Sequence, residues 1–267
     1  MALPLYAHWE TLMRLQMCLT FLALLLVQSA GADDANEAGL TVEQTAELAK
    51  SLEKSLAAAK LAIETNPKDL DAYSRRGDAN FFLGKFAEAV ADYDRMVELD
   101  DTLANSHWRR GIALFYAGRY KDAATQFENY HSFDQVDREN GIWRYLSQHK
   151  AYGQDKAREG LLKYEKDDRE PFPSVYKLFA GTRTADEIEE QISTAKISKE
   201  EREKRAFYAQ LYIGLNFAVE GDGKAATRHL HLATTNKWGP RAGYGPNYMW
   251  HVGRLHEQLL REASKTE

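Results

Sequence analysis

Hydrophobic and polar positions repeat at a fixed spacing through the middle of the chain. Residues 75–95 read RRGDANFFLGKFAEAVADYDR, and residues 109–129 read RRGIALFYAGRYKDAATQFEN. In each stretch apolar residues recur every three or four positions on both sides of a glycine, which predicts two amphipathic helices joined by a turn. The matched residues lie 34 positions apart and are Gly77 with Gly111, Gly84 with Gly118, Phe86 with Tyr120, Ala89 with Ala123, and Tyr93 with Phe127.

The matched residues suit the packing of two antiparallel helices. Gly77 and Gly111 fall where the first helix would pack closest to its neighbour, and Gly84 and Gly118 where that helix would end in a turn. A period of 34 residues with small residues at fixed places is typical of tetratricopeptide repeats. Because one hairpin cannot bury its apolar face alone, copies stack. The sequence therefore predicts an all-α solenoid of helix-turn-helix hairpins.

The same register continues on both sides of the two copies. Upstream, TVEQ at Thr41 predicts a capping box, and residues 56–70 predict the second helix of a preceding unit. Downstream, residues 142–162 fit a third unit, in which Tyr145 or Leu146 stands where the first helix has its glycine. We expect this third unit to keep the hairpin arrangement with a slip of about one residue under the repeat rule.

A more distant copy lies near the C-terminus, with Gly214 and Gly221 at the two glycine positions. A shortened, divergent unit precedes it, with a turn at Gly181 and a helix N-cap at Thr184. Residues 248–265 predict an amphipathic helix that caps the solenoid. The predicted solenoid spans 41–267, with repeats near 70–103, 104–137, 138–171 and 207–240 and the divergent unit at 172–200.

The N-terminal residues predict a secretory signal peptide over 1–32. A basic start, the uncharged apolar run LQMCLTFLALLLVQ and the small residues before Ala32 fit that class, with cleavage between Ala32 and Asp33 and a short linker over 33–40. The apolar run is shorter than a membrane span needs, although an uncleaved anchor is the alternative. The single cysteine, Cys18, lies near the start of this run and not after it, so we expect no lipid anchor and a periplasmic or secreted chain.

Composition and motifs argue against several functional classes. The 267 residues carry a net charge of −5, which disfavours a nucleic-acid binder. The motifs HExxH, GxSxG, GxxxxGK and GxGxxG do not occur, so we expect no metal, no cofactor and no catalytic residue. The alternative is a hydrolase or other enzyme whose site assembles from His229, His251 or His256 with nearby carboxylates. A protein-binding surface is the favoured interpretation.

The first helices of the hairpins would line the concave face of such a solenoid. Trp108 and Trp143 fall 35 positions apart, each followed by an arginine, Arg109 and Arg144. Tryptophan and arginine are the residues that most often anchor interfaces. The alternative is that these tryptophans fill the core between helices. The predicted protein-binding residues are Phe81, Phe82, Trp108, Arg109, Ile112, Phe115, Tyr116, Trp143, Arg144 and Ser147.

Longer stretches carry a resemblance to one family. They are ANSHWRRGIALFYAGRYKDA, GIWRYLSQHKAYGQDKA, KLFAGTRTADEIEEQI and FYAQLYIGLNFAVEGDGKAA, in this order, between about residues 56 and 260. With them the chain resembles the NlpI-like tetratricopeptide repeat proteins of the bacterial envelope. The resemblance implies a homodimeric, non-enzymatic scaffold that binds other proteins and brings an envelope protease together with peptidoglycan hydrolases. The missing lipobox cysteine is a departure from that family.

Overall fold

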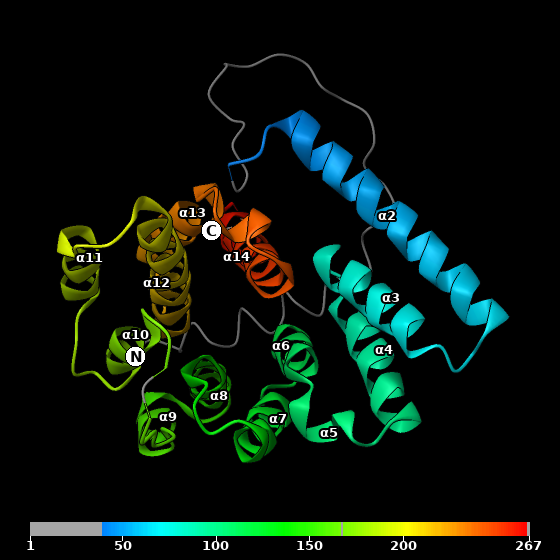
Figure 1. Ribbon diagram of the computed structural model, residues 1–267, viewed down its shortest axis with the longest axis horizontal. Helices are drawn as coiled ribbons and strands as arrows, with labels where there is room; N and C mark the ends of the chain where they lie inside the picture. The colour runs from blue at the N-terminus through cyan, green and yellow to red at the C-terminus, as the bar shows by residue number, and fades with distance from the viewer. Residues whose placement is uncertain (1–38, 167, 266–267) are drawn as a thin grey trace, which may run out of the picture. The chain divides into compact units, whose positions relative to one another are not determined.

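The computed structural model describes residues 39–166 and 168–265. The predicted signal peptide, its cleavage site at Ala32 and Asp33, and the linker up to residue 38 lie outside the described residues. Throughout the described part the regular structure is helical and no strand forms, as Figure 1 shows. The predicted all-α class is therefore confirmed. No helix of the described part is both long enough and apolar enough to cross a membrane.

The helices follow one another through short connections. In chain order they are α2 (Val42–Thr65), α3 (Leu70–Phe82), α4 (Phe86–Leu99), α5 (Leu103–Ser106), α6 (Trp108–Tyr116), α7 (Tyr120–Phe133), α8 (Arg138–Tyr152), α9 (Gln154–Glu159), α10 (Phe172–Phe179), α11 (Ala185–Thr194), α12 (Lys199–Glu220), α13 (Gly223–Thr235), the 3-10 helix η1 (Gly239–Arg241) and α14 (Tyr244–Ser264). Each of the pairs α3–α4, α6–α7 and α12–α13 packs as neighbours in sequence and in space.

The expected close approach within these pairs is confirmed at the first glycine. A Cβ atom on Gly77 would lie 2.5 Å from the ring of Tyr93, and one on Gly111 would lie 2.6 Å from the ring of Phe127. In α12–α13 a Cβ on Gly214 would lie 2.7 Å from the Leu230 side chain. The aromatic or aliphatic residue of the second helix therefore fills the space that the glycine leaves.

The expected helix ends are also confirmed. Gly84 and Gly118 follow α3 and α6 with φ of +75°, the left-handed region that favours glycine. Thr41 and Thr184 each form a capping box, at the N-termini of α2 and α11. The polar pattern of the sequence was sufficient to place these boundaries.

Three predictions about the helices differ from the structure. α2 is one continuous helix of 24 residues that ends at Thr65, so the helix predicted over residues 56–70 begins earlier and ends five residues sooner. α14 begins at Tyr244, four residues before the predicted start. In the third unit the second helix, α9, stops at Glu159, and the chain up to Pro171 runs outside regular helix where it is described.

The third unit differs from the first two hairpins because aromatic side chains occupy the place that a packed second helix would take. A Cβ on Gly141 would lie 2.5 Å from the hydroxyl of Tyr164 and 3.0 Å from Tyr176. Tyr164 belongs to the segment after α9, and its ring meets that of Tyr176 of α10 edge-on, with centroids 5.2 Å apart. α10 then packs against α8 and α12. A bulky irregular segment therefore replaces the regular hairpin of the first two units.

Candidate functional site

The structure places the predicted protein-binding residues on α3, α6 and α8, and most of them are buried. The eight buried residues are Phe81, Phe82, Ile112, Phe115, Tyr116, Trp143, Arg144 and Ser147. Trp108 and Arg109 are partly exposed. Those eight side chains are therefore covered within the chain, and a role of theirs in binding another protein stays a prediction. The physical reason differs between the first two hairpins, which face α14, and α8, which lies inside the core.

α14 covers the first two hairpins with a row of rings, and Figure 1 shows it beside α3 and α6. Tyr248 stacks on Phe81 with centroids 5.1 Å apart, and His251 stacks on Phe82 at 3.9 Å. Tyr248 also meets Trp108 edge-on at 4.9 Å. We call Phe81, Phe82, Trp108 and Tyr116 the α14-facing surface. Such ring pairs add to the stability that buried apolar area provides.

A polar contact closes one end of this row. Arg109 of α6 donates from Nη1 to Asp78 Oδ1 at 2.7 Å and to the Tyr244 hydroxyl at 2.7 Å. The Tyr244 hydroxyl donates to Asp78 Oδ2 at 2.5 Å, and the Tyr93 hydroxyl donates to Asp78 Oδ1 at 2.7 Å. The carboxylate raises the pKa of Arg109 above its ordinary value despite burial, so the ion pair persists across the physiological range.

Neutral histidines lie at the other end of the row. His256 Nδ1 lies 2.9 Å from the Tyr116 hydroxyl, and burial lowers the pKa of His256 to about 4. Burial likewise lowers the pKa of His251, with a further lowering by Arg254. Arg254 donates from Nη2 to the Phe82 carbonyl at 2.6 Å. Both imidazoles are therefore uncharged at neutral pH and act as aromatic packing groups.

Trp143 of α8 belongs to the core, so the alternative that it fills the space between helices is the correct one. Its ring stacks on Phe127 at 6.1 Å and meets Phe115 at 5.6 Å and Tyr212 at 6.4 Å. Arg144 pairs with Glu128 at 2.5 Å and donates to the Gly160 carbonyl. Arg144 therefore ties α8 to α7 and to the segment after α9.

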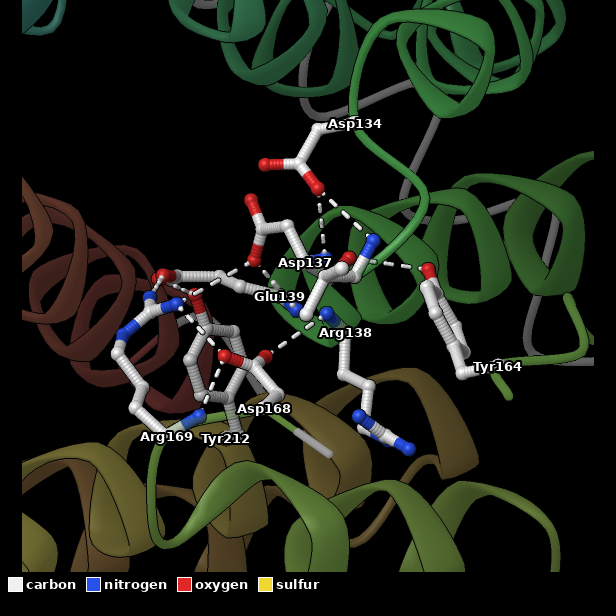
Figure 2. A network of polar contacts seen from close by, with 9 residues as sticks. Asp134, Asp137, Arg138, Glu139, Tyr164, Asp168, Arg169 and Tyr212 are labelled. Atoms are coloured by element: carbon white, nitrogen blue, oxygen red, sulfur yellow. Dashed lines mark hydrogen bonds and ion pairs between the residues drawn. The ribbon is translucent and has the colours of Figure 1, made fainter. Parts of the chain in front are cut away.

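A polar network around Arg169, drawn in Figure 2, includes Tyr212, whose ring meets that of Trp143. The Arg169 guanidinium contacts Glu139 and lies 3.5 Å from Asp137 and 3.3 Å from Asp168. The Tyr212 hydroxyl of α12 donates to the other Glu139 oxygen. The network therefore joins the start of α8, the segment before α10, and α12.

The same network caps the N-terminus of α8. The Asp168 carboxylate accepts from the backbone N–H of Arg138 at 2.9 Å, and Asp137 accepts from that of Glu139 at 3.1 Å. Negative side chains at a helix N-terminus satisfy free N–H groups and complement the helix dipole. Three carboxylates therefore surround one guanidinium, which leaves excess negative charge in a largely buried place.

The pKa of Glu139 is raised in this negatively charged environment. Burial raises the pKa of Glu139 from 4.5 to about 7, Arg169 opposes the rise, and Asp137 adds to it. Burial also raises the pKa of Asp137. The Glu139 side chain is only 15% exposed, so bulk water solvates its charge poorly. A proton on Glu139 is thus in exchange near neutral pH.

The histidines of the alternative enzyme interpretation lie in separate contacts. His229 Nδ1 lies 2.7 Å from the Gln210 amide oxygen and 3.4 Å from Glu189. His251 and His256 take part in the α14 contacts, and burial keeps them neutral. Throughout the described residues no group of three or more His, Cys, Asp or Glu side chains could hold a metal ion.

Sequence reasoning missed the partners that make the two polar sites. Tyr244 precedes the expected start of α14, and Arg169 lies in a stretch read as part of a regular repeat. Tyr244 and Tyr248 are four positions apart and share one helix face, which was the available signal for α14 as a helix that contacts other rings. Comparison with models of known protein families and with curated proteins gives no match.

Proposed function

We propose that the chain is a tetratricopeptide repeat solenoid that binds other proteins and acts as an adaptor. The observation that carries the proposal is the repeated packing of three helix pairs. In each of them a glycine of the first helix receives one large side chain of the second, as Gly77, Gly111 and Gly214 do. Repeat architectures of this kind present extended surfaces for protein partners.

The partner class follows from the resemblance to the NlpI-like proteins. We propose that the chain is a homodimer of the periplasm, or is secreted, and links an envelope protease to peptidoglycan hydrolases without catalysing a reaction itself. Its acidic balance, with a net charge of −5, supports a protein partner over a nucleic acid. The neutral, packed state of His251 and His256 supports a binding role over an enzymatic one.

A reconstitution tests this proposal. The chain from Asp33 would be mixed with a purified periplasmic processing protease and a purified peptidoglycan endopeptidase, and the complexes followed by size-exclusion chromatography with light scattering. We expect a dimeric chain and a ternary complex, with faster degradation of the endopeptidase when the chain is present. Absence of any pairwise complex would refute the adaptor function.

A control separates binding from catalysis. The chain alone would be incubated with peptidoglycan and with peptide substrates, beside His229→Gln and His256→Gln variants. We expect no turnover from any of the three proteins. Turnover by the unaltered chain that one histidine variant abolishes would replace the adaptor with the enzyme interpretation.

A further inference from the structure

α14 contacts two parts of the chain in different ways. It packs closely along α13, where a Cβ on Gly253 would lie 3.3 Å from Thr234, and Trp250 donates from Nε1 to the Thr234 carbonyl at 2.9 Å. Glu257 of α14 accepts from the Thr234 hydroxyl at 2.9 Å and lies 3.1 Å from His231. α13 and α14 therefore pack closely together, and α13 packs in turn on α12.

Toward α3 and α6, the contacts described for α14 run through long side chains. Tyr244, Tyr248 and His251 follow one another at spacings of four and three residues, which puts their rings on one face of the helix. These rings span the distance to the α14-facing surface, and polar contacts close the row at both ends. Tyr244 itself is 53% exposed, so its polar contact lies at the surface of the molecule.

We propose that the α14-facing surface is a helix-binding groove that α14 occupies within its own chain, and that a partner's amphipathic helix can take this place. The partner helix would carry aromatic residues at positions i, i+4 and i+7, as Tyr244, Tyr248 and His251 do, and an arginine at i+10, as Arg254 does. This proposal rests on the protein-binding function proposed above. It names the site and the class of partner that the site accepts.

The geometry matches the known way in which a groove binds an amphipathic helix. Apolar anchors at helical spacing enter a groove lined by rings, and polar groups at the ends fix the direction. The direction here is set by Asp78 and Arg109 at one end and by the Phe82 carbonyl at the other. The partner class is therefore a tyrosine- or phenylalanine-bearing helix and not an extended peptide.

The position of α14 within the chain makes it a competitor of that partner. A tethered segment acts at a high effective concentration, so a free helix binds weakly while α14 is in place. The apparent affinity is the intrinsic affinity multiplied by the fraction of chains whose groove is open. A substitution that weakens α14 without touching the groove must therefore strengthen binding of the partner helix. Tyr244→Phe is such a substitution, because it removes only the hydroxyl that Asp78 and Arg109 hold.

The test uses the whole chain from Asp33 and a fluorescein-labelled synthetic peptide with the sequence of residues 244–265. Fluorescence polarisation would give the dissociation constant for the unaltered chain, for Tyr244→Phe, and for Tyr152→Phe, which alters an exposed tyrosine of α8. We expect about tenfold tighter binding by Tyr244→Phe, the effect of losing a hydrogen bond to a charged group, and no change for Tyr152→Phe. Equal affinity of all three proteins for the peptide would overturn the proposal.

Two further measurements locate the peptide. A Trp108→Leu substitution in the Tyr244→Phe protein should abolish the gain, because Trp108 belongs to the groove and not to α14. Hydrogen exchange should become faster in α14 when the peptide binds, and unaltered exchange in α14 would contradict displacement. If no protein binds the peptide while the protease and endopeptidase still form complexes with the chain, the adaptor function holds through another surface and the groove proposal is wrong.

Discussion

Glu139 provides the sharpest test of the polar network, through a Glu139→Gln substitution. The glutamine keeps the size of the side chain and an oxygen that accepts from Tyr212, but it cannot ionise. The substitution therefore removes the proton equilibrium at this position and weakens the contact with Arg169. Both effects depend on pH through the protonation of Glu139, since Arg169 stays charged and attracts Glu139 only when Glu139 is ionised.

The magnitude follows from the displaced pKa of Glu139. The folded chain holds the proton with a pKa of about 7, against an ordinary value of 4.5, so protonation favours the folded state. This contribution to the free energy of unfolding is complete below pH of about 4.5 and is lost as pH rises through about 7. The whole displacement is worth about 3 kcal/mol, at about 1.4 kcal/mol for each pH unit, and about 2–3 kcal/mol of it is lost between pH 5 and pH 8.

Buried histidines act in the opposite direction over the same range. Burial lowers the pKa of His107 to about 3 and that of His256 to about 4, and it also lowers that of His251. Each of them stabilises the folded state above the unfolded value near 6.5 and loses that contribution as pH falls. The pH dependence of the total free energy of unfolding therefore mixes the effects of Glu139 and the histidines. The difference in this free energy between the unaltered chain and Glu139→Gln reports Glu139 alone.

The assay is urea unfolding followed by circular dichroism at half-unit steps from pH 5 to pH 8. We expect the unaltered chain to lose about 2–3 kcal/mol relative to Glu139→Gln over this range. Glu165→Gln, an exposed acid before Arg169, is the matched control and should follow the unaltered chain at every pH. Parallel curves for the unaltered chain and Glu139→Gln would refute the reasoning, because they would mean that Glu139 ionises normally.

Three substitutions test the repeat packing and the caps, each by the midpoint of urea unfolding. Gly111→Ala should destabilise the chain by about 1–3 kcal/mol, because its Cβ would lie 2.6 Å from Phe127 in a packed core; a neutral result would deny the close approach. Gly118→Ala should cost about 1 kcal/mol from the positive φ alone, since no atom lies within 4 Å, and a loss above 3 kcal/mol would reveal a contact there. Thr184→Ala should cost about 1 kcal/mol by removing the cap, and Thr184→Ser should restore most of it.

Local features of the sequence predicted the regular part of the fold well. Gly84 and Thr184 were placed correctly because a left-handed turn and a helix N-cap depend on a few neighbouring residues. The third unit could not be predicted in the same way. Its second helix ends at Glu159, and Tyr164 then packs against Gly141, more than twenty residues earlier in the chain. No local sequence pattern predicts that contact.

The candidate site shows a stronger limit of the same kind. Phe82 and Trp143 carry the same signal in the sequence, an aromatic residue on the first helix of a hairpin. Phe82 packs against His251, about 170 positions later, whereas Trp143 packs against Phe127 of the neighbouring helix. Burial within a hairpin is set by near neighbours, and burial under α14 is set by a distant helix. Only the three-dimensional arrangement of the helices distinguishes burial within a hairpin from burial under α14.

This difference decides which of the buried aromatic residues can take part in binding. Removing Trp143 from its place would open the core between α7, α8 and α12, and such a cavity costs several kcal/mol. Phe82 and Trp108 lie under rings that belong to another helix, and a second helix with the same spacing can satisfy the same contacts. Burial under α14 therefore does not argue against a role in recognition. It makes recognition a competition between two helices, whose outcome depends on how firmly Asp78 and Arg109 hold Tyr244.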